Sequence, residues 1–462
     1  MKLLFVIYDN ESFFTYFSMG IGYLVSAVRK VGHDVEVYDM NIYHLPVKYL
    51  KDYLEKTHFD VVGIGMIAGY HQYKKIIEIS EAITSVQKRP LFVIGGHMFA
   101  PDPEYFIKRT GADVVVIGEA EISFINLLDA FASNRNFSEV KGIAYVEGNK
   151  VVVNERERLI ENLDSIEFPG WDAFNMEYYT LMRNPRIKHW ERSFQVIASR
   201  GCVFTCNFCY RMDKGFRHRS PENIIEEINK LQVDYHVNYI NFTDELLTSS
   251  KRMTIKFCEA LIKSGLNINF FCNGRLDFAS KEVVKLLKTA GCVYINYGIE
   301  SLDDEVLEKM NKKLTVDQIR AGIKNTIEAG IHPGFNIIFG NIGDTKETLR
   351  KSVEFLLKYT TYTELRTIRP VTPYPGSPLF YSAIEMGLLK NTEDFYEHKH
   401  VNSDLLAVNF TELSDKEFYN CLFDANKVLI EDYFKKSAED NIKDFYGLYF
   451  EGDTSYRGPR QT

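Results

Sequence analysis

Cysteine is missing from the first 201 residues of this 462-residue chain, and all seven cysteines lie beyond that point. An odd number of cysteines in a chain of this length argues against a disulfide framework. No stretch approaches the roughly 18 apolar residues of a transmembrane helix. The apolar run at residues 3–7 is too short for a secretory signal and lacks a small-residue cleavage site. These absences predict a cytoplasmic protein without a membrane span, in which clustered cysteines are metal ligands.

An excess of positive charge is also missing. The chain has 55 Lys and Arg against 63 Asp and Glu, a formal charge of −8, so no nucleic-acid partner is expected. Its 45% hydrophobic and 26% charged residues exclude disorder as the main description. The length suggests about three folding units. Aromatic residues reach 14%, which indicates a large core, pockets for flat ligands, or both.

Residues 1–133 alternate predicted strands with predicted helices. The nearly continuous apolar runs typical of parallel strands covered on both faces are at 3–7, 34–38, 61–66, 91–94 and 114–117. Helical segments follow them at 20–31, 47–56, 73–86, 102–109 and 121–132. The pattern predicts a doubly wound parallel α/β sheet, which binds ligands at the carboxyl ends of its strands.

Glycine-rich turns follow three of these strands, at residues 63–69, 95–97 and 118–121. Glycine allows the backbone to approach a ligand closely. No Gly-x-Gly-x-x-Gly follows the first strand, so a nicotinamide dinucleotide fits poorly. The turns read GIGMIAGY, VIGGHMFAPDPE and VVVIGEAEISF, and in this order they resemble the cobalamin-binding domain attached to many radical S-adenosylmethionine (SAM) enzymes.

This resemblance implies cobalamin contacts at the strand ends, from Tyr8, Met66, Ile67, Ala68, Gly69, Gly95, Gly96, His97, Gly118, Glu119 and Glu121. Cobalamin domains that use histidine as the lower axial ligand carry Asp-x-His-x-x-Gly after the first strand. The corresponding place here reads DNESF, from Asp9 to Phe13, without histidine. We interpret His97 as a turn residue near the corrin or solvent and not as a substitute ligand.

Residues 134–190 are predicted to connect two domains. The runs 142–146 and 150–153 flank Glu147-Gly148-Asn149, which indicates a short β-hairpin. The sequence around Pro169, Gly170 and Trp171 then suggests a linker packed between domains.

Three of the cysteines lie within eight residues. Cys202, Cys206 and Cys209 have the spacing Cys-x3-Cys-x2-Cys. Zinc would need a fourth ligand nearby, and neither His218 nor Cys258 has a zinc-finger spacing. A cubane 4Fe–4S cluster usually takes four cysteines, so three leave one iron open to another ligand.

The segment CVFTCNFC matches the signature of the radical SAM family, including the aromatic Phe208 before the last cysteine. The resemblance implies that SAM chelates the open iron through its amino and carboxylate groups. An electron from the cluster then cleaves SAM to methionine and a 5′-deoxyadenosyl radical. An external electron donor of the flavodoxin or ferredoxin type is therefore implied as a partner.

Six predicted strands, at 194–198, 239–242, 268–271, 294–297, 335–339 and 365–368, alternate with helices around and after this motif. Ser220-Pro221 indicates one helix start, and Thr315 with Gln318 forms a capping box for another. Six βα units predict a partial (β/α)6 barrel over residues 191–380, with its active residues at the C-terminal strand ends. Residues 381–462 are expected to form a mostly helical tail.

The strand ends resemble the family's SAM-binding turns, including GIES at 298–301 and the proline-rich turn PYPGS at 373–377. They imply SAM contacts from Phe208, Asp244, Glu245, Asn273, Arg275, Glu300, Ser301, Asn336, Pro373 and Tyr374. Arg275 is expected to pair with the SAM carboxylate, and Glu300 to accept ribose hydroxyls. Taken singly, each charged residue could equally be a helix cap or a surface ion pair.

Two other groups of residues are less informative. The basic stretch after the cysteines, with Arg211, Lys214, Arg217, His218 and Arg219, could receive an anionic substrate or form a solvated loop. The isolated cysteines Cys258, Cys272, Cys292 and Cys421 are expected to pack as small hydrophobic residues.

The sequence therefore predicts a cobalamin-dependent radical SAM enzyme, most simply a methyltransferase that acts on an unactivated carbon of a small-molecule or peptide substrate. An oxidative cyclase or ring-rearranging enzyme, similar to the anaerobic cyclase of bacteriochlorophyll synthesis, is the alternative. A non-enzymatic module with structural zinc is an alternative of another class. A tRNA methylthiotransferase would need a second cysteine trio, which the cysteine-free residues 1–201 exclude.

Overall fold

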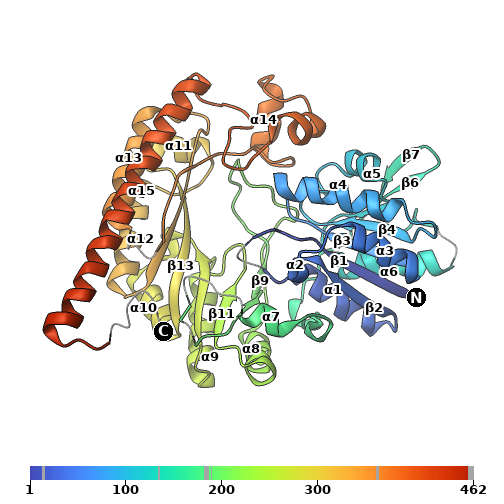
Figure 1. The fold of residues 1–462 in the computed structure, drawn as a ribbon, viewed down its shortest axis with the longest axis horizontal. Helices are drawn as coiled ribbons and strands as arrows, with labels where there is room; N and C mark the ends of the chain where they lie inside the picture. The colour runs from blue at the N-terminus through green and yellow to red at the C-terminus, as the bar shows by residue number, and fades with distance from the viewer. Residues whose placement is uncertain (13–15, 134–135, 182–186, 189, 361–363, 456–462) are drawn as a thin grey trace.

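A computed structural model describes residues 1–12, 16–133, 136–181, 187–188, 190–360 and 364–455. Figure 1 shows two α/β bodies beside each other, with a long C-terminal helix along the outer side of the second body. Within the described ranges, none of the helices has both the length and the apolar character needed to cross a membrane.

The first body contains a seven-stranded sheet in the order β2-β1-β3-β4-β5-β6-β7. Its five parallel strands are β1 (Lys2–Ile7), β2 (Asp34–Asp39), β3 (Val61–Gly65), β4 (Leu91–Gly95) and β5 (Val114–Val116). The predicted hairpin forms as β6 (Ile143–Glu147) and β7 (Lys150–Val153), and it extends this sheet through antiparallel pairing with β5. The carboxyl ends of the parallel strands therefore lie at one edge, where doubly wound sheets bind ligands.

Helices cover both faces of this sheet. On one face, α1 (Met19–Lys30) contacts α6 (Ala120–Ser133). On the other face, α4 (Tyr70–Thr84) lies between α3 (Lys48–Lys56) and α5 (Pro103–Thr110), while the short α2 (Met40–Tyr43) follows β2. Local signals set the ends of these helices, because Asp102 caps α5 by accepting from the backbone of Tyr105 and Gly111 ends it at φ +67°.

The connector packs closely against the first body. It contains the short helical turns η1 (Leu163–Ser165) and η2 (Trp171–Ala173) and the helix α7 (Met176–Leu181). The backbone N–H of Gly170 donates to the carbonyl of Gly22 over 2.9 Å. A Cβ atom at Gly22 would lie 2.9 Å from Pro169 Cβ, so glycine permits this contact. Trp171 is buried as well, which explains the aromatic residue in this segment.

The second body is built on a six-stranded parallel sheet in the order β15-β14-β13-β12-β11-β8. The strands are β8 (Ser193–Val196), β11 (Tyr239–Phe242), β12 (Asn269–Gly274), β13 (Cys292–Glu300), β14 (His332–Phe339) and β15 (Arg369–Pro370). This is the predicted partial barrel. The prediction of a last strand at 365–368 was wrong, because the backbone N–H and carbonyl of Ile368 bond to the side chain of Asn426 and not to β14.

Helices pack on the outer, convex face of the barrel sheet. They are α8 (Pro221–Tyr235), α9 (Lys251–Ser264), α10 (Lys281–Thr289), α11 (Asp304–Lys309), α12 (Val316–Glu328) and α13 (Lys346–Tyr359). Ser220 caps α8 and Thr315 forms the predicted capping box with Gln318 at α12. In Figure 1, α12 and α13 lie on the side of the sheet away from the first body, so the concave face turns toward that body.

The C-terminal region contacts both bodies. It comprises α14 (Pro378–Glu385), the π-helical turn η4 (Asp394–Lys399), the long helix α15 (Asp415–Tyr446) and a second such turn, η5 (Gly447–Glu451). Tyr396 stacks on Tyr73 of the first body with ring centroids 4.7 Å apart. Phe418 of α15 stacks on Phe339 of β14 at 4.8 Å. The predicted helical tail therefore joins the two α/β bodies.

Candidate active site

The three clustered cysteines lie in a closed loop at the C-terminal end of β8. The loop is closed by antiparallel pairing of β9 (Ser199–Arg200) with β10 (Arg217–His218). Gly201 has φ +85°, and a Cβ atom there would lie 2.4 Å from the carbonyl oxygen of Gly215. Only glycine allows the two ends of the loop to approach this closely.

The thiols of this loop are near enough to influence one another. Cys206 is buried, Cys202 half-buried and Cys209 exposed. Partial desolvation, together with the charges of Cys206, Glu245 and Cys202, raises the pKa of Cys209 to about 12. Bound metal would overcome this effect by stabilising the thiolates. The three side chains therefore fit the ligand set of a cluster with one open iron.

No three His, Cys, Asp or Glu side chains within the described residues have the geometry of a single-ion site. A cubane cluster does not need such a geometry, because each of its cysteines binds a different iron and not one shared ion.

Asn207, between the second and third cysteines, anchors the loop to the rest of the barrel. Its N–H donates to Met310 O (2.9 Å), and its carbonyl accepts from Leu379 N (2.8 Å). Its side chain donates to Lys309 O (3.1 Å) and exchanges hydrogen bonds of 3.2 Å with Asn341. The cysteine spacing gave no signal for this role, because every partner lies more than 100 residues away in sequence.

Asp244 supports the strand that leads into the cysteine loop. Its carboxylate accepts from the backbone N–H of Ala198 at 3.1 Å and from the hydroxyl of Ser199. Burial, partly offset by these hydrogen bonds, raises the pKa of Asp244 to about 6. The neighbouring Glu245 is exposed and lies near Cys209. Of the predicted acidic pair, Glu245 is therefore the better placed to meet a ligand.

We expect Asp244 to make the unfolding free energy depend on pH. Because its pKa is raised in the folded state, the native protein retains the proton that the unfolded chain loses, so stability falls as pH rises from about 4 to about 6. The full loss corresponds to about 3 kcal/mol. Asp244→Asn should flatten this slope in urea denaturation curves at pH 4.5 and 7, whereas an equal slope in both proteins would contradict the assignment.

Arg275 is engaged within the protein. Its guanidinium donates to Asp277 at 3.0 and 3.2 Å and to the carbonyls of Lys312 and Lys313 at 2.9 and 2.8 Å. It also lies 3.6 Å from the ring centroid of Phe204 in the cysteine loop. The predicted pairing with the SAM carboxylate would have to replace some of these bonds.

Glu300 has a strained backbone at the end of β13. Its φ is +70°, in the left-handed region, and it follows an irregularity in the pairing with β14. Its buried carboxylate accepts from Lys312 Nζ at 3.0 Å. A Cβ atom at Gly298 would lie 2.6 Å from Glu300 Oε1, so glycine makes room for this pair. Backbone strain of this kind gathers at functional sites, and the adjacent Ser301 Oγ is buried without a partner.

The other predicted SAM contacts lie on the concave side of the sheet, in the turn after β15 and in the cysteine loop. Asn273 and Asn336 lie on the concave side of the sheet, half-buried and exposed respectively. Pro373 is buried, and the ring of Tyr374 packs against His400 with centroids 5.3 Å apart. Phe208 is half-buried, with Lys312 Nζ 5.7 Å from its ring centroid.

The strand ends of the first body face the cysteine loop. Gly96 has φ +106°, and a Cβ there would lie 2.4 Å from the carbonyl oxygen of Met66. The ring of His97 is 6.1 Å from that of Tyr210, which follows the last cysteine. Burial lowers the pKa of His97. Ile67, in the turn after β3, exposes 59% of its surface.

The remaining residues of the predicted cobalamin set vary in burial. Tyr8, Ala68, Gly95 and Gly118 are half-buried, and Gly69 is buried. A Cβ at Gly118 would lie 3.5 Å from Asp213 Oδ1, an ordinary contact. The turns after β4 and β5 therefore approach the loop that holds the cysteines, and the turn after β3 packs against the turn after β4.

Glu119 and Glu121 bind arginines of the second body. Arg217 Nη2 lies 2.7 Å from Glu119 Oε1, and Arg200 lies 3.3 Å from Glu119 and 2.6 Å from Glu121. Burial opposes ionisation of Glu119, but the two arginines outweigh it and lower its pKa. These two predicted cobalamin contacts thus join the domains on either side of the cysteine loop.

The basic stretch has a structural role that neither sequence interpretation included. Besides the pairing of Arg217, Arg219 forms a buried ion pair with Glu227 and donates to the carbonyl of Ile197 over 2.7 Å. Arg211 donates to the carbonyl of Cys202 at 3.3 Å. These cations hold the loop in place.

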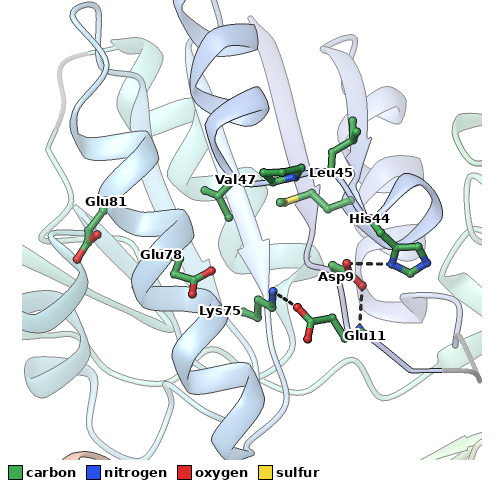
Figure 2. A pocket seen from close by; sticks show the side chains of 10 residues that line it. Asp9, Glu11, His44, Leu45, Val47, Lys75, Glu78 and Glu81 are labelled. Carbon is green, nitrogen blue, oxygen red and sulfur yellow. Dashed lines mark hydrogen bonds and ion pairs between the residues drawn. The ribbon is translucent and has the colours of Figure 1, made fainter.

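A charged cavity of about 520 Å³ lies beside the carboxyl ends of β1 and β2, and Figure 2 shows the side chains that line it. Within it, His44 Nδ1 lies 2.9 Å from Asp9 Oδ2, and Lys75 pairs with Glu11. His71 Nε2 also lies 3.4 Å from the carbonyl oxygen of Asp9. Two histidines, His44 and His71, therefore lie beside the segment where the axial-ligand motif is missing. They contact the Asp9 carboxylate and the Asp9 carbonyl. The size is typical of small-ligand pockets, so a molecule as large as cobalamin would place only a part of itself here.

Comparison with known proteins identifies both halves of this site. Residues 7–128 match the B12 binding domain, and residues 196–356 match the radical SAM superfamily. An uncharacterized methyltransferase of Pyrococcus horikoshii is 29% identical over 94% of this chain and 95% of its own length. The anaerobic magnesium-protoporphyrin IX monomethyl ester cyclase of Cereibacter sphaeroides is 28% identical over 78% of this chain and 59% of its own.

The fold is also known from a solved structure. The radical SAM methyltransferase TsrM from Kitasatospora setae, solved with cobalamin and a 4Fe–4S cluster, superposes with a TM-score of 0.69 over 85% of this chain and 79% of its own, at 18% identity. A B12-binding domain facing a radical SAM barrel defines a class of enzymes. The chain belongs to this class, the cobalamin-binding radical SAM enzymes, whose cofactors are a 4Fe–4S cluster, SAM and cobalamin.

Proposed function

We propose that this protein is a cobalamin-dependent radical SAM methyltransferase that methylates an unactivated carbon of a small-molecule or peptide substrate. The observation that carries the proposal is the contact between the cysteine loop and the B12-side strand ends. The ring of Tyr210, directly after the last cysteine, lies 6.1 Å from that of His97, and Gly376 of the last barrel turn fits between Tyr210 and Pro101, where a Cβ atom would lie 2.5 and 3.0 Å from them. The cluster with SAM supplies a carbon-centred radical, and cobalamin supplies the methyl group.

The chain's own residues would position these groups. Cys202, Cys206 and Cys209 would hold the cluster, and Glu245 would accept from the amino group of SAM. On the opposite side, the turns containing Ile67 and Gly96 would support the corrin. A site closed between the two domains would exclude water, which protects reactive intermediates from side reactions.

An external electron donor of the flavodoxin or ferredoxin type would reduce the cluster. Cys209 is the exposed cysteine of the trio, so this edge of the cluster would be the one open to electron entry. A reducing cytoplasm would keep the thiols available for iron.

Product analysis of the anaerobically reconstituted enzyme tests this function. The protein would be supplied with cobalamin, a reductant, SAM carrying a deuterated methyl group, and a small-molecule extract of its own cells. We expect 5′-deoxyadenosine and S-adenosylhomocysteine together, with the label in a new small molecule. Deoxyadenosine without S-adenosylhomocysteine would contradict methyl transfer.

That contrary outcome would favour an oxidative cyclase or ring-rearranging enzyme as the second candidate. The similarity to the Cereibacter sphaeroides cyclase supports it, although this chain covers only 59% of that protein. A cyclase would consume SAM for radical formation and would have no need of its methyl group.

A further inference from the structure

Unpartnered polar atoms lie side by side on two strands of the barrel sheet. Gln195 of β8 is in register with Asn241 of β11, and Thr243 follows two residues later. The side chains of Gln195 and Asn241 are only 5% and 6% exposed. Gln195 Oε1, Asn241 Oδ1 and Thr243 Oγ1 are all buried without a hydrogen-bond partner. Buried polar atoms are nearly always paired, so this group requires an explanation.

The alternation of the strands places these side chains on the concave face. Ile240 and Phe242, on either side of Asn241, are fully buried in the core beneath the outer helices. The ring of Phe242 lies 5.4 Å from that of Phe257 in α9. Because successive side chains of a strand point to opposite faces, Asn241 points away from these helices. Gln195 shares its face, since the two residues are register partners.

The polar surface continues across the sheet. Asn273 Nδ2 donates to the carbonyl of Asp244 at 2.8 Å, and Asn273 Oδ1 accepts from Asn296 at 3.2 Å. Both amides are half-buried, and Asn336 on β14 is exposed. The concave face therefore leads from solvent to the unpartnered atoms through five side-chain amides and one hydroxyl, which we call the amide row: Gln195, Asn241, Thr243, Asn273, Asn296 and Asn336. Because Asn273 and Asn336 are also predicted SAM contacts, a substrate group would be bound by the inner members, Gln195, Asn241 and Thr243.

Charged groups near the amide row are already paired. Lys312 bonds to Glu300 at 3.0 Å, and Arg366 bonds to Glu364 and to the hydroxyl of Tyr294. To meet an anionic group in the row, Lys312 and Arg366 would have to give up these partners. A hydrocarbon would leave three buried polar atoms unsatisfied, each at a cost of about 1–3 kcal/mol.

We propose that the amide row binds a neutral substrate group that both donates and accepts hydrogen bonds, such as a carboxamide or lactam. This inference rests on the proposed function, because it assigns the row to that enzyme's substrate. An amide side chain carries a donor NH2 group beside an acceptor oxygen, so it can pair with both the donor and the acceptor of a carboxamide or lactam. A site that hydrogen-bonds its substrate strongly rejects analogues without those hydrogen-bonding groups. An apolar pocket rejects a substrate with an added polar group much less strongly.

Binding of 2-pyrrolidinone, a lactam, to the reconstituted holoprotein tests the inference, with acetate as the charged comparison. Ligand-observed NMR should show binding of 2-pyrrolidinone and none of acetate. Asn241→Leu and Thr243→Val should each weaken lactam binding about tenfold, because each removes a hydrogen-bonding group at nearly constant volume. Equal binding by wild type and both variants, or stronger binding of acetate, would overturn the proposal.

Melting temperature provides the matched control. Thr326→Val makes the same change at a buried threonine that bonds to Tyr297 Oη and Gly322 O at 2.8 Å. It should lower the melting temperature and leave lactam binding unchanged. Thr243→Val should keep or raise the melting temperature, since it removes an unpartnered atom. A loss as large as that of Thr326→Val would show a structural role and contradict the inference.

These measurements require no turnover. An enzyme that bound the lactam through the row but formed no S-adenosylhomocysteine would refute the proposed methyl transfer alone. Methyl transfer with no lactam binding would refute the amide row alone.

Discussion

A Cys206→Ser protein, reconstituted anaerobically with iron and sulfide, is expected to form no 5′-deoxyadenosine above the rate seen without protein. Cys206 is the buried member of the trio, in a loop fixed by the adjacent Asn207. A serine hydroxyl is a much poorer ligand than a thiolate for iron in such a cluster. Deoxyadenosine measured by chromatography, together with iron content, checks this expectation.

The matched control for this change is Cys421→Ser. Cys421 is half-buried on α15, where its thiol donates to the carbonyl of Phe418. This variant should retain wild-type iron content and SAM cleavage. Normal deoxyadenosine formation by the Cys206 variant, or an equal loss in the Cys421 variant, would contradict the assignment of the cluster.

Glu119→Gln is expected to loosen the contact between the two α/β domains and to reduce methyl transfer more than SAM cleavage. The substitution removes the carboxylate that holds both Arg200 and Arg217. Breaking such a partly buried, charge-assisted pair should cost about 2–3 kcal/mol of unfolding free energy. SAM cleavage depends on the barrel, whereas methyl transfer depends on the position of both domains. The ratio of S-adenosylhomocysteine to deoxyadenosine should therefore fall.

Glu354→Gln on α13 is the control, because Glu354 forms an exposed ion pair with Arg350. Exposed pairs contribute at most about 1 kcal/mol. An unchanged product ratio in the Glu119 variant, or the same drop in both variants, would contradict a role for the interdomain pairs.

The sequence was most informative where structure depends on local signals. The strands of the first domain were predicted to within a residue or two, because apolar runs and glycine turns mark them directly. Caps such as Ser220 and Thr315 have their predicted partners for the same reason. The last barrel strand was misplaced because Asn426, almost 60 residues away, binds the backbone of Ile368. No local pattern reports such a contact.

Side-chain partners were harder to predict than positions. Glu119, Glu121 and Arg275 lie at the predicted strand ends, yet the packing of other segments determines what they bind. Gln195 and Asn241 lie in strands that the sequence predicts. That they are neighbours on the same face of the sheet follows only from the register between β8 and β11.

Metal content and the visible spectrum of the anaerobically purified protein show directly whether one chain holds both an iron–sulfur cluster and cobalamin. We expect about four iron atoms and one cobalt per chain, with absorption from both cofactors and a change in the cluster's EPR signal when SAM is added. A colourless protein with one zinc per chain and neither iron nor cobalt would contradict this expectation.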